Sequence, residues 1–273
     1  IYGNKVGLLS ASLVFILVSP APYILMIGNL VSIMFNLPLI IGILIGVIFS
    51  LSYLIYGGYK ADVYTDVFLF FIMFIGFIVI VFVLLSSFGG IEFLTTNLPA
   101  SHLKLTGDAS ATFIIVWFLL ALWTFADPGF HQRTYAAKDG NTAVKGILIS
   151  IILWIIFDFF TNTTGLFARA ILPNLQNPVL SYPLLADKIL SSGLKGLFFI
   201  ALFATIFSTS NSFFFLSGTT LGRDIFYNIS RKKDENKIKS YSIIGLIITA
   251  IISIVLAMII PSVIQLWYTL GSI

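Results

Sequence analysis

Long apolar runs alternate with short polar segments along most of this chain. A helix that crosses a bilayer needs about 20 mostly apolar residues, and seven runs satisfy this at least roughly. They cover residues 6–29, 37–56, 67–88, 111–135, 145–171, 195–218 and 240–260, with an eighth beginning near residue 262. Barrel strands would be shorter and would strictly alternate apolar with polar positions. The pattern therefore predicts an all-α, polytopic transmembrane helical bundle, forming one domain over residues 1–273.

Composition excludes an ordinary water-soluble fold. Of the 273 residues, 59% are hydrophobic and only 10% are charged, with a mean hydropathy of +1.06, whereas soluble domains carry about 25% charged residues. When the runs alternate through a membrane, eleven of the fifteen Lys and Arg residues fall on one face, which the positive-inside rule makes cytoplasmic. No nucleic-acid motif accompanies the net charge of +4, so we expect no nucleic-acid partner.

The absence of cysteine from the sequence excludes disulfides, thiolate metal sites and a cysteine nucleophile. The chain begins at Ile1 rather than at Met and ends inside an apolar run. We therefore expect it to be a piece of a longer protein.

Hydroxyl side chains line one face of the sixth apolar run. Thr205, Ser208, Thr209 and Ser212 recur at spacings of three and four residues, which places them on one side of a helix, and Asn211 flanks them. Single hydroxyls in such helices commonly bond the carbonyl one turn earlier or join neighbouring helices. Five polar residues within eight positions exceed that pattern. Neutral oxygens in this arrangement suit a weakly held, dehydrated Na⁺, because they are hard ligands without excess charge.

A second polar stretch, TFADPGFHQR at residues 124–133, interrupts the fourth run. Pro128 removes a backbone donor and clashes with the preceding turn, and Asp127 before it is an N-cap signal. Two half-helices are predicted, roughly 111–125 and 128–137, joined by an unwound segment. Such segments survive at membrane depth only where they line a protein or water cavity, and many secondary transporters bind substrate there. Equally compatible is a helix that simply leaves the membrane at this point.

Acidic residues mark two further runs. Asp158 lies near the middle of the fifth run, with Asn162 one turn further on. An unpaired carboxylate at that depth would be protonated or would bind a cation, and the alternative is a hydrogen-bond partner for a neighbouring helix. Asp66 lies at the cytoplasmic start of the third run, where the helix dipole favours an acid. His102 and His131 lack metal-ligand spacing with any other ligand, so no metal centre is predicted.

Three segments resemble one known family. IYGGYKADVYTDVF at residues 55–68 and ALFATIFSTSNSFFFLSGTTLGRDIF at residues 201–226 resemble the two signatures of the sodium:solute symporter family, the second being the more specific. DPGFHQRTYAAKD at residues 127–139 resembles the inner end of that family's broken helix. The resemblance covers nearly the whole chain in the family's order and spacing. It implies a LeuT-like inverted-repeat fold, here incomplete, running from the third core helix to the start of the tenth.

The resemblance also implies cation sites. In the family one sodium lies between the first and eighth core helices, and its ligands here would be the hydroxyls of Ser208 and Thr209 and the carbonyl of Thr205. Some members hold a second cation nearby, with the acid that begins the fifth core helix. That second set would be Asp66, Ser208, Asn211 and Ser212.

A solute site follows from the same resemblance. The family holds its substrate between broken helices, which implicates Trp123, Thr124 and Asp127 on the sixth core helix and Gln265 on the tenth. Leu69 departs from the family, which often has Gln at that place. Asp127 and the proline after it fall near positions that bind sugar through amides in sugar-transporting relatives, which argues against a sugar. An acid in the unwound segment favours a zwitterionic or cationic solute.

The sequence therefore predicts a secondary transporter, not an enzyme, that couples Na⁺ entry to uptake of a small organic solute across the plasma membrane by alternating access. Its expected partners are the solute, Na⁺ and the lipid bilayer, with no cofactor, and the sequence leaves the solute and the oligomeric state open. One alternative is H⁺ coupling through Asp158 or Asp66. Others are a non-transporting sensor or assembly subunit, a channel, and an intramembrane enzyme, for which no hydrolase motif surrounds Asp127 and Asp158.

Overall fold

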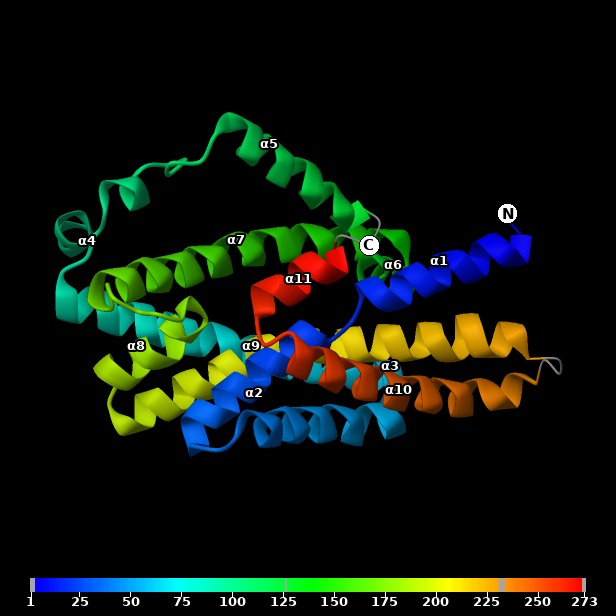
Figure 1. Cartoon of the computed structure of the whole chain (residues 1–273). Helices are drawn as coiled ribbons and strands as arrows, with labels where there is room; N and C mark the ends of the chain where they lie inside the picture. Colours follow the sequence, from blue (N-terminus) through cyan, green and yellow to red (C-terminus); the bar gives the residue numbers. More distant parts are fainter. Residues whose placement is uncertain (1–2, 126, 231–233, 272–273) are drawn as a thin grey trace. The chain divides into compact units, whose positions relative to one another are not determined.

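The computed structural model describes residues 3–125, 127–230 and 234–271, and every regular element in these ranges is a helix (Figure 1). The chain divides into two compact units, unit 1 (Ile1–Phe71 and Phe203–Ile273) and unit 2 (Ile72–Leu202). Both boundaries fall inside long helices, so each of these two helices contributes residues to both units. A single transmembrane domain over residues 1–273 stays a prediction.

Unit 1 is built from helices at both ends of the chain. Its elements are α1 (Gly3–Leu17), α2 (Ala21–Phe35), the first part of α3 (Leu39–Phe88), the second part of α9 (Ser192–Thr219), the π-helix η4 (Thr220–Tyr227), the 3₁₀ turn η5 (Glu235–Lys237), α10 (Ile238–Ile259) and α11 (Val263–Gly271). One cluster of buried apolar residues joins α2, α3, α9, α10 and α11. It includes Ile24, Leu25, Ile43, Val47, Leu54, Phe214, Leu246, Ala250, Ala257 and Leu266.

The helix α3 is a hairpin of two limbs rather than one span. Its 50 residues would extend about 75 Å as a straight helix, far more than the roughly 30 Å of a bilayer core. Gly58 interrupts it with φ 55 and ψ −146, a backbone conformation that is costly for residues with a Cβ. This confirms the separate runs 37–56 and 67–88 predicted from the sequence.

Contacts along α9 follow the reversal at this turn. Phe49 contacts Phe207 before the turn, Tyr59 contacts Phe215 directly after Gly58, and Asp62 then contacts Ser212, one turn back along α9. The first residues of the second limb therefore lie beside the hydroxyl face of α9.

The run 6–29 does not form the one continuous helix that the sequence predicted. Helix α1 ends at Leu17 and α2 begins at Ala21, with Pro20 between them. The backbone N–H of Ala21 bonds the Ser19 hydroxyl at 3.4 Å, and Pro22 occupies the first turn of α2, where proline is tolerated because its missing donor is not needed. By length and composition the whole stretch Lys5–Phe35 still suffices for one membrane crossing.

Close backbone contact holds α10 against α9. A Cβ at Gly245 would lie 2.2 Å from the carbonyl oxygen of Gly218, so only glycine permits this approach. One turn further on, the hydroxyls of Ser217 and Thr249 lie 3.3 Å apart. Small residues and a buried hydroxyl pair therefore fix the position of α9 in unit 1.

Unit 2 contains the middle of the chain. Its elements are the second part of α3, α4 (Ile91–Asn97), the 3₁₀ turn η1 (Ala100–Leu103), α5 (Ala111–Leu120), the 3₁₀ helix η2 (Ala121–Phe125), α6 (Pro128–Tyr135), α7 (Gly140–Ile171), the 3₁₀ turn η3 (Pro178–Leu180), α8 (Ser181–Ile189) and the first part of α9. Phe77 on α3 is buried among the rings of Phe157, Tyr182 and Phe198. The Tyr182 hydroxyl also donates to the Thr161 carbonyl at 3.0 Å and so ties α8 to α7.

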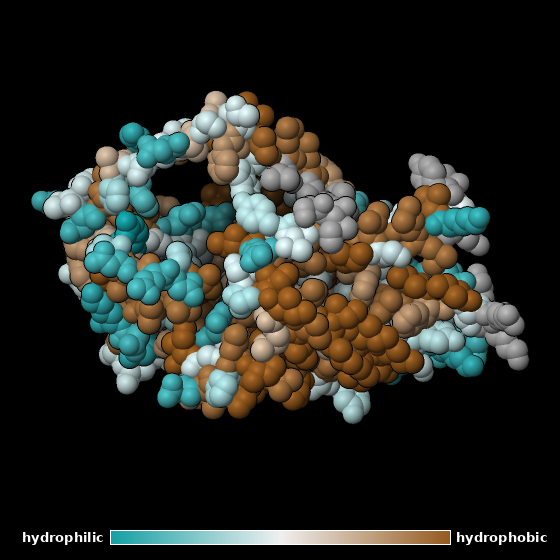
Figure 2. All heavy atoms as spheres, in the orientation of Figure 1, coloured by the Kyte–Doolittle hydropathy of each residue, from teal (hydrophilic) through white to brown (hydrophobic). Residues whose placement is uncertain are grey.

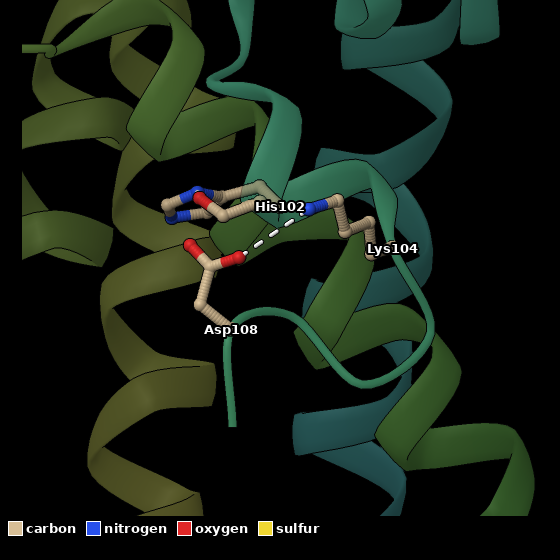
Figure 3. A network of polar contacts seen from close by, with 4 residues as sticks. His102, Lys104 and Asp108 are labelled. Carbon is tan, nitrogen blue, oxygen red and sulfur yellow. Dashed lines mark hydrogen bonds and ion pairs between the residues drawn. The ribbon is translucent and has the colours of Figure 1, made fainter. Parts of the chain in front are cut away.

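Five stretches in the described residues are long and apolar enough to cross a membrane. Figure 2 shows apolar side chains over α10, where Ile247, Ile251 and Val255 are exposed. The loop between α4 and α5 is polar by contrast, and there Lys104 and Asp108 form an exposed ion pair at 3.4 Å, beside His102 (Figure 3). Such a pair adds little stability, which suits a loop in water.

Candidate functional site

The predicted hydroxyl face is present on the part of α9 that belongs to unit 1. Thr205, Ser208, Thr209 and Ser212 are all half-buried, so they are neither locked in the core nor fully open. The Thr209 hydroxyl donates to the Thr205 carbonyl at 3.5 Å, which is at the limit for a hydrogen bond. A bond this long is readily exchanged for a better partner. The oxygens of this face therefore remain chemically accessible to a cation.

Ser212 uses its hydroxyl differently from an ordinary helix serine. Its Oγ donates to Oδ2 of Asp62 at 3.2 Å, across 150 positions of sequence. Asp62 is 1% exposed. Keeping a carboxyl group away from water is costly unless it is hydrogen-bonded or paired, which makes Asp62 a candidate for the site. The hydrogen bond places a carboxyl group at one end of the hydroxyl face.

The sequence pattern predicted a role for Asp66 but none for Asp62. The two acids are four residues apart on the second limb of α3, so they share one helix face. Asp66 is half-buried, and the carboxylate that meets Ser212 is that of Asp62. The recurrence of acid at i and i+4 within an apolar segment was the available signal, because it predicts a charged stripe rather than a single helix-start acid.

Asn211 lies on a more deeply buried stripe of α9 than Ser212. It is 0% exposed, and within the part of the chain described here neither atom of its amide has a hydrogen-bond partner. Successive residues of a helix are about 100° apart, and Asn211 lies between the core residues Phe207 and Phe214 along one stripe of α9. Its grouping with Asp66 and Ser212 in a second cation site stays a prediction.

The broken helix predicted in the fourth run is confirmed. Helix α5 tightens into η2, which ends at Phe125, and α6 begins at Pro128; Ala126 lies outside the described residues. Asp127 has extended backbone angles (φ −63, ψ 116), and its carboxylate accepts the N–H groups of Gly129 at 2.6 Å and Phe130 at 3.4 Å. The Asp-Pro signal therefore predicted the cap correctly, and the structure gives Asp127 a structural role before any role in solute binding.

His131 bridges this break, which the sequence did not predict. Its Nε2 lies 2.8 Å from the carbonyl oxygen of Phe125. A carbonyl can only accept, so Nε2 carries the proton and donates. The ring also stacks on Tyr135, with centroids 5.9 Å apart. Asp127 thus caps the start of α6, and His131 links α6 back to the end of η2.

The other residues predicted to bind solute are exposed or have side chains outside the described part of the structure. Thr124 is exposed on η2, and the side chain of Trp123 lies outside the described part of the structure. Gln265 is exposed on α11 in unit 1, and its backbone N–H bonds the Ser262 hydroxyl at 3.3 Å. Thr124 and Asp127 belong to unit 2. Their assembly into one solute site stays a prediction.

Asp158 lies on an exposed face in the middle of α7. Arg169, near the end of the same helix, bonds the carbonyl of Pro173 beyond it. Exposed apolar residues such as Ile155 and Phe159 adjoin the acid. A role for Asp158 in carrying a proton or a cation therefore stays a prediction.

The fold and these features define a class, a multi-pass helical membrane protein with a broken helix and a hydroxyl-lined helix face. Comparison with known proteins gives the family. The sodium:solute symporter family model matches residues 3–270, so the chain belongs to the sodium:solute symporter family.

Several curated proteins are similar to this chain. The sodium/pantothenate symporter of Escherichia coli is 27% identical over 227 residues, which are 80% of this chain and 47% of that protein. The sodium/glucose cotransporter of Vibrio parahaemolyticus is 28% identical over 258 residues, with 80% of this chain and 47% of that protein covered. The sodium/myo-inositol cotransporter 2 of Bos taurus is 26% identical, covering 74% and 36%. The chain thus spans about half the length of the bacterial relatives.

Proposed function

We propose that the protein containing this chain couples inward movement of Na⁺ to uptake of a small organic solute across the plasma membrane by alternating access. The observation that carries the proposal is the half-buried hydroxyl face of α9, with the buried Asp62 carboxylate bonded to Ser212 at its end. The relatives support it, since their names pair sodium with an organic solute: pantothenate, glucose or myo-inositol. Such transport requires no covalent chemistry and no cofactor.

The first cation would be held by the hydroxyls of Ser208 and Thr209 and the carbonyl of Thr205. Sodium is a hard cation that takes several oxygen ligands, and neutral ones bind it reversibly. Binding would replace the 3.5 Å bond between Thr209 and the Thr205 carbonyl with ion–oxygen contacts. Because that bond is weak, losing it costs little.

A second cation would bind nearby through Asp66, Ser212 and Asn211. We extend this set to Asp62, since its carboxylate already contacts Ser212. Partial neutralisation by a cation would lower the cost of keeping that carboxylate out of water. A carboxylate at one end of α9 would attract Na⁺. Replacing either Asp62 or Asp66 would then lower the affinity for Na⁺.

The solute would contact Trp123, Thr124 and Asp127 at the helix break, together with Gln265. Backbone that is not hydrogen-bonded within a helix offers donors and acceptors to a solute. Each ligand would bind weakly alone and more tightly when the other is present, and this mutual coupling free energy is what drives uptake.

Uptake into proteoliposomes tests the proposal. The full-length protein would be supplied with radiolabelled pantothenate, glucose, myo-inositol, a monocarboxylate, an amino acid and an amine, under a Na⁺ gradient or a pH gradient alone. Accumulation that needs Na⁺ supports the proposal. Accumulation that follows the pH gradient and ignores Na⁺ would replace it with proton coupling and make Asp158, Asp66 and Asp62 the next targets. Exclusive preference for anionic solutes would exclude the expected zwitterionic or cationic solute.

A further inference from the structure

The helix break leaves two backbone carbonyls without their usual donors. In a continuous helix the N–H of residue 128 would bond the carbonyl of Thr124, and the N–H of Gly129 would bond the carbonyl of Phe125. Pro128 has no N–H. The Gly129 N–H bonds the Asp127 carboxylate instead, at 2.6 Å. The cap that starts α6 therefore takes the donor that Phe125 would otherwise have.

His131 supplies the replacement donor. Its Nε2–H reaches back six positions to the Phe125 carbonyl at 2.8 Å, a normal length for a hydrogen bond from nitrogen to oxygen. One lost backbone bond, Gly129 to Phe125, is thus replaced by two side-chain bonds, both made by side chains of the α6 end of the break. The imidazole ring also stacks on Tyr135.

We propose that His131 is a positioning residue for solute binding: its Nε2–H holds the Phe125 carbonyl, and with it the neighbouring Thr124, in the geometry in which the unwound segment takes the solute. This inference rests on the proposed function, because it assigns the break as the solute site. Without the bridge, one side-chain bond between η2 and α6 would be lost, and the segment would sample more arrangements. Solute binding would then include the cost of ordering it.

Three substitutions separate the bond from the bulk of the ring. Glutamine carries a donor nitrogen at nearly the distance of Nε2, asparagine carries one at the position of Nδ1, and leucine carries none. His131→Gln should therefore preserve the bridge, whereas His131→Asn and His131→Leu should break it. His102→Leu is the matched control, since His102 is an exposed histidine far from the break in sequence, and its Nδ1 lies 3.3 Å from the Ser101 hydroxyl.

Two measurements on the full-length protein test the inference. Hydrogen–deuterium exchange in detergent, without solute, follows the amides of residues 121–131. Uptake at saturating Na⁺ gives KM and kcat for whichever of pantothenate, glucose or myo-inositol the wild type accumulates. We expect His131→Leu and His131→Asn to raise both the exchange rate and KM about five- to tenfold, as for one lost hydrogen bond, while kcat stays within about twofold. His131→Gln and His102→Leu should resemble the wild type.

Unchanged exchange in His131→Leu would overturn the inference, as would a glutamine variant that behaves like the leucine one. Faster exchange with an unchanged KM would also overturn it, because His131 would then be structural only. If the wild type accumulates no member of the panel under a Na⁺ gradient, the proposed function fails separately. The exchange measurement still decides whether His131 holds the break.

Discussion

The hydroxyl of Ser212 on α9 donates to the buried carboxylate of Asp62 on the second limb of α3, at 3.2 Å. The fold of α3 at Gly58 is what brings these two residues together. A hydroxyl face and a carboxylate thus adjoin in one compact unit, which is the arrangement that a reversible cation site requires. Replacing either residue should therefore change the affinity for Na⁺.

Removing the charge of Asp62 should weaken Na⁺ binding. Asp62→Asn keeps an oxygen that can accept from Ser212 but loses the negative charge, and cation affinity depends on ligand charge. We expect the Na⁺ concentration for half-maximal uptake to rise about tenfold or more. Asp108→Asn is the matched control, because Asp108 is 73% exposed in its ion pair. Equal Na⁺ dependence in both variants would remove Asp62 from the cation site.

A side chain at Gly58 should destabilise the turn of α3. Gly58 has φ 55, and Gly58→Ala should lower stability by about 1–2 kcal/mol because a Cβ is unfavourable there. Gly146→Ala on α7 provides the contrast, since a Cβ there meets nothing within 4 Å and alanine favours helix by up to about 1 kcal/mol. Thermal unfolding in detergent should therefore move in opposite directions for the two variants. A shift of the same sign would contradict the strained turn.

Capping and solute binding by Asp127 can be separated by two variants. Asp127→Asn retains an oxygen for the N–H groups of Gly129 and Phe130, so stability should change little. Asp127→Ala removes the cap and should cost about 0.5–2 kcal/mol. If the charge also binds solute, both variants should raise the solute KM. A normal KM in Asp127→Asn would leave Asp127 with the capping role alone.

Tyr182 should make the protein sensitive to alkaline pH. It lies in α8, outside the candidate membrane spans, and burial raises the pKa of its phenol above the usual value. The folded state therefore keeps this proton when the unfolded state loses it near pH 10. The phenol's contribution to stability is complete below about pH 10 and is lost as pH rises through the higher folded-state pKa.

Tyr182→Phe should accordingly lose about 1 kcal/mol at neutral pH, because the bond to the Thr161 carbonyl is gone. Its thermal unfolding midpoint should then fall less steeply than that of the wild type between pH 9 and pH 11. Parallel curves for the two proteins would show that the phenol does not titrate with unfolding.

Local signals predicted much of this structure. The Asp127-Pro128 pair is a short-range cap signal, and it gave the helix break correctly. The spacing of the hydroxyl residues predicted correctly that they share one face of α9. This needs only the periodicity of a single helix and no knowledge of what packs against it. The break at Pro20 was missed because proline is common inside membrane helices. The position of a proline in the sequence does not tell whether the helix bends there or ends there.

The long-range contacts could not be predicted in the same way. Asp62 meets Ser212 only because α3 reverses at Gly58, so neither residue carries a local sign of the other. The His131 bridge depends on the Asp127 carboxylate having taken the Gly129 donor. Both contacts depend on where the backbone turns, and a sequence pattern gives the type of an element better than its path.

The most direct test of sodium coupling compares the wild type with Ser208→Ala plus Thr209→Ala in proteoliposomes, measuring solute uptake against Na⁺ concentration. The double variant removes the two hydroxyls that we propose as Na⁺ ligands and leaves Asp62 unchanged. We predict Na⁺-dependent uptake in both proteins, with the Na⁺ requirement of the variant raised by about tenfold or more. Uptake that follows a pH gradient, with the variant indistinguishable from the wild type, would contradict the assignment of coupling to the α9 face.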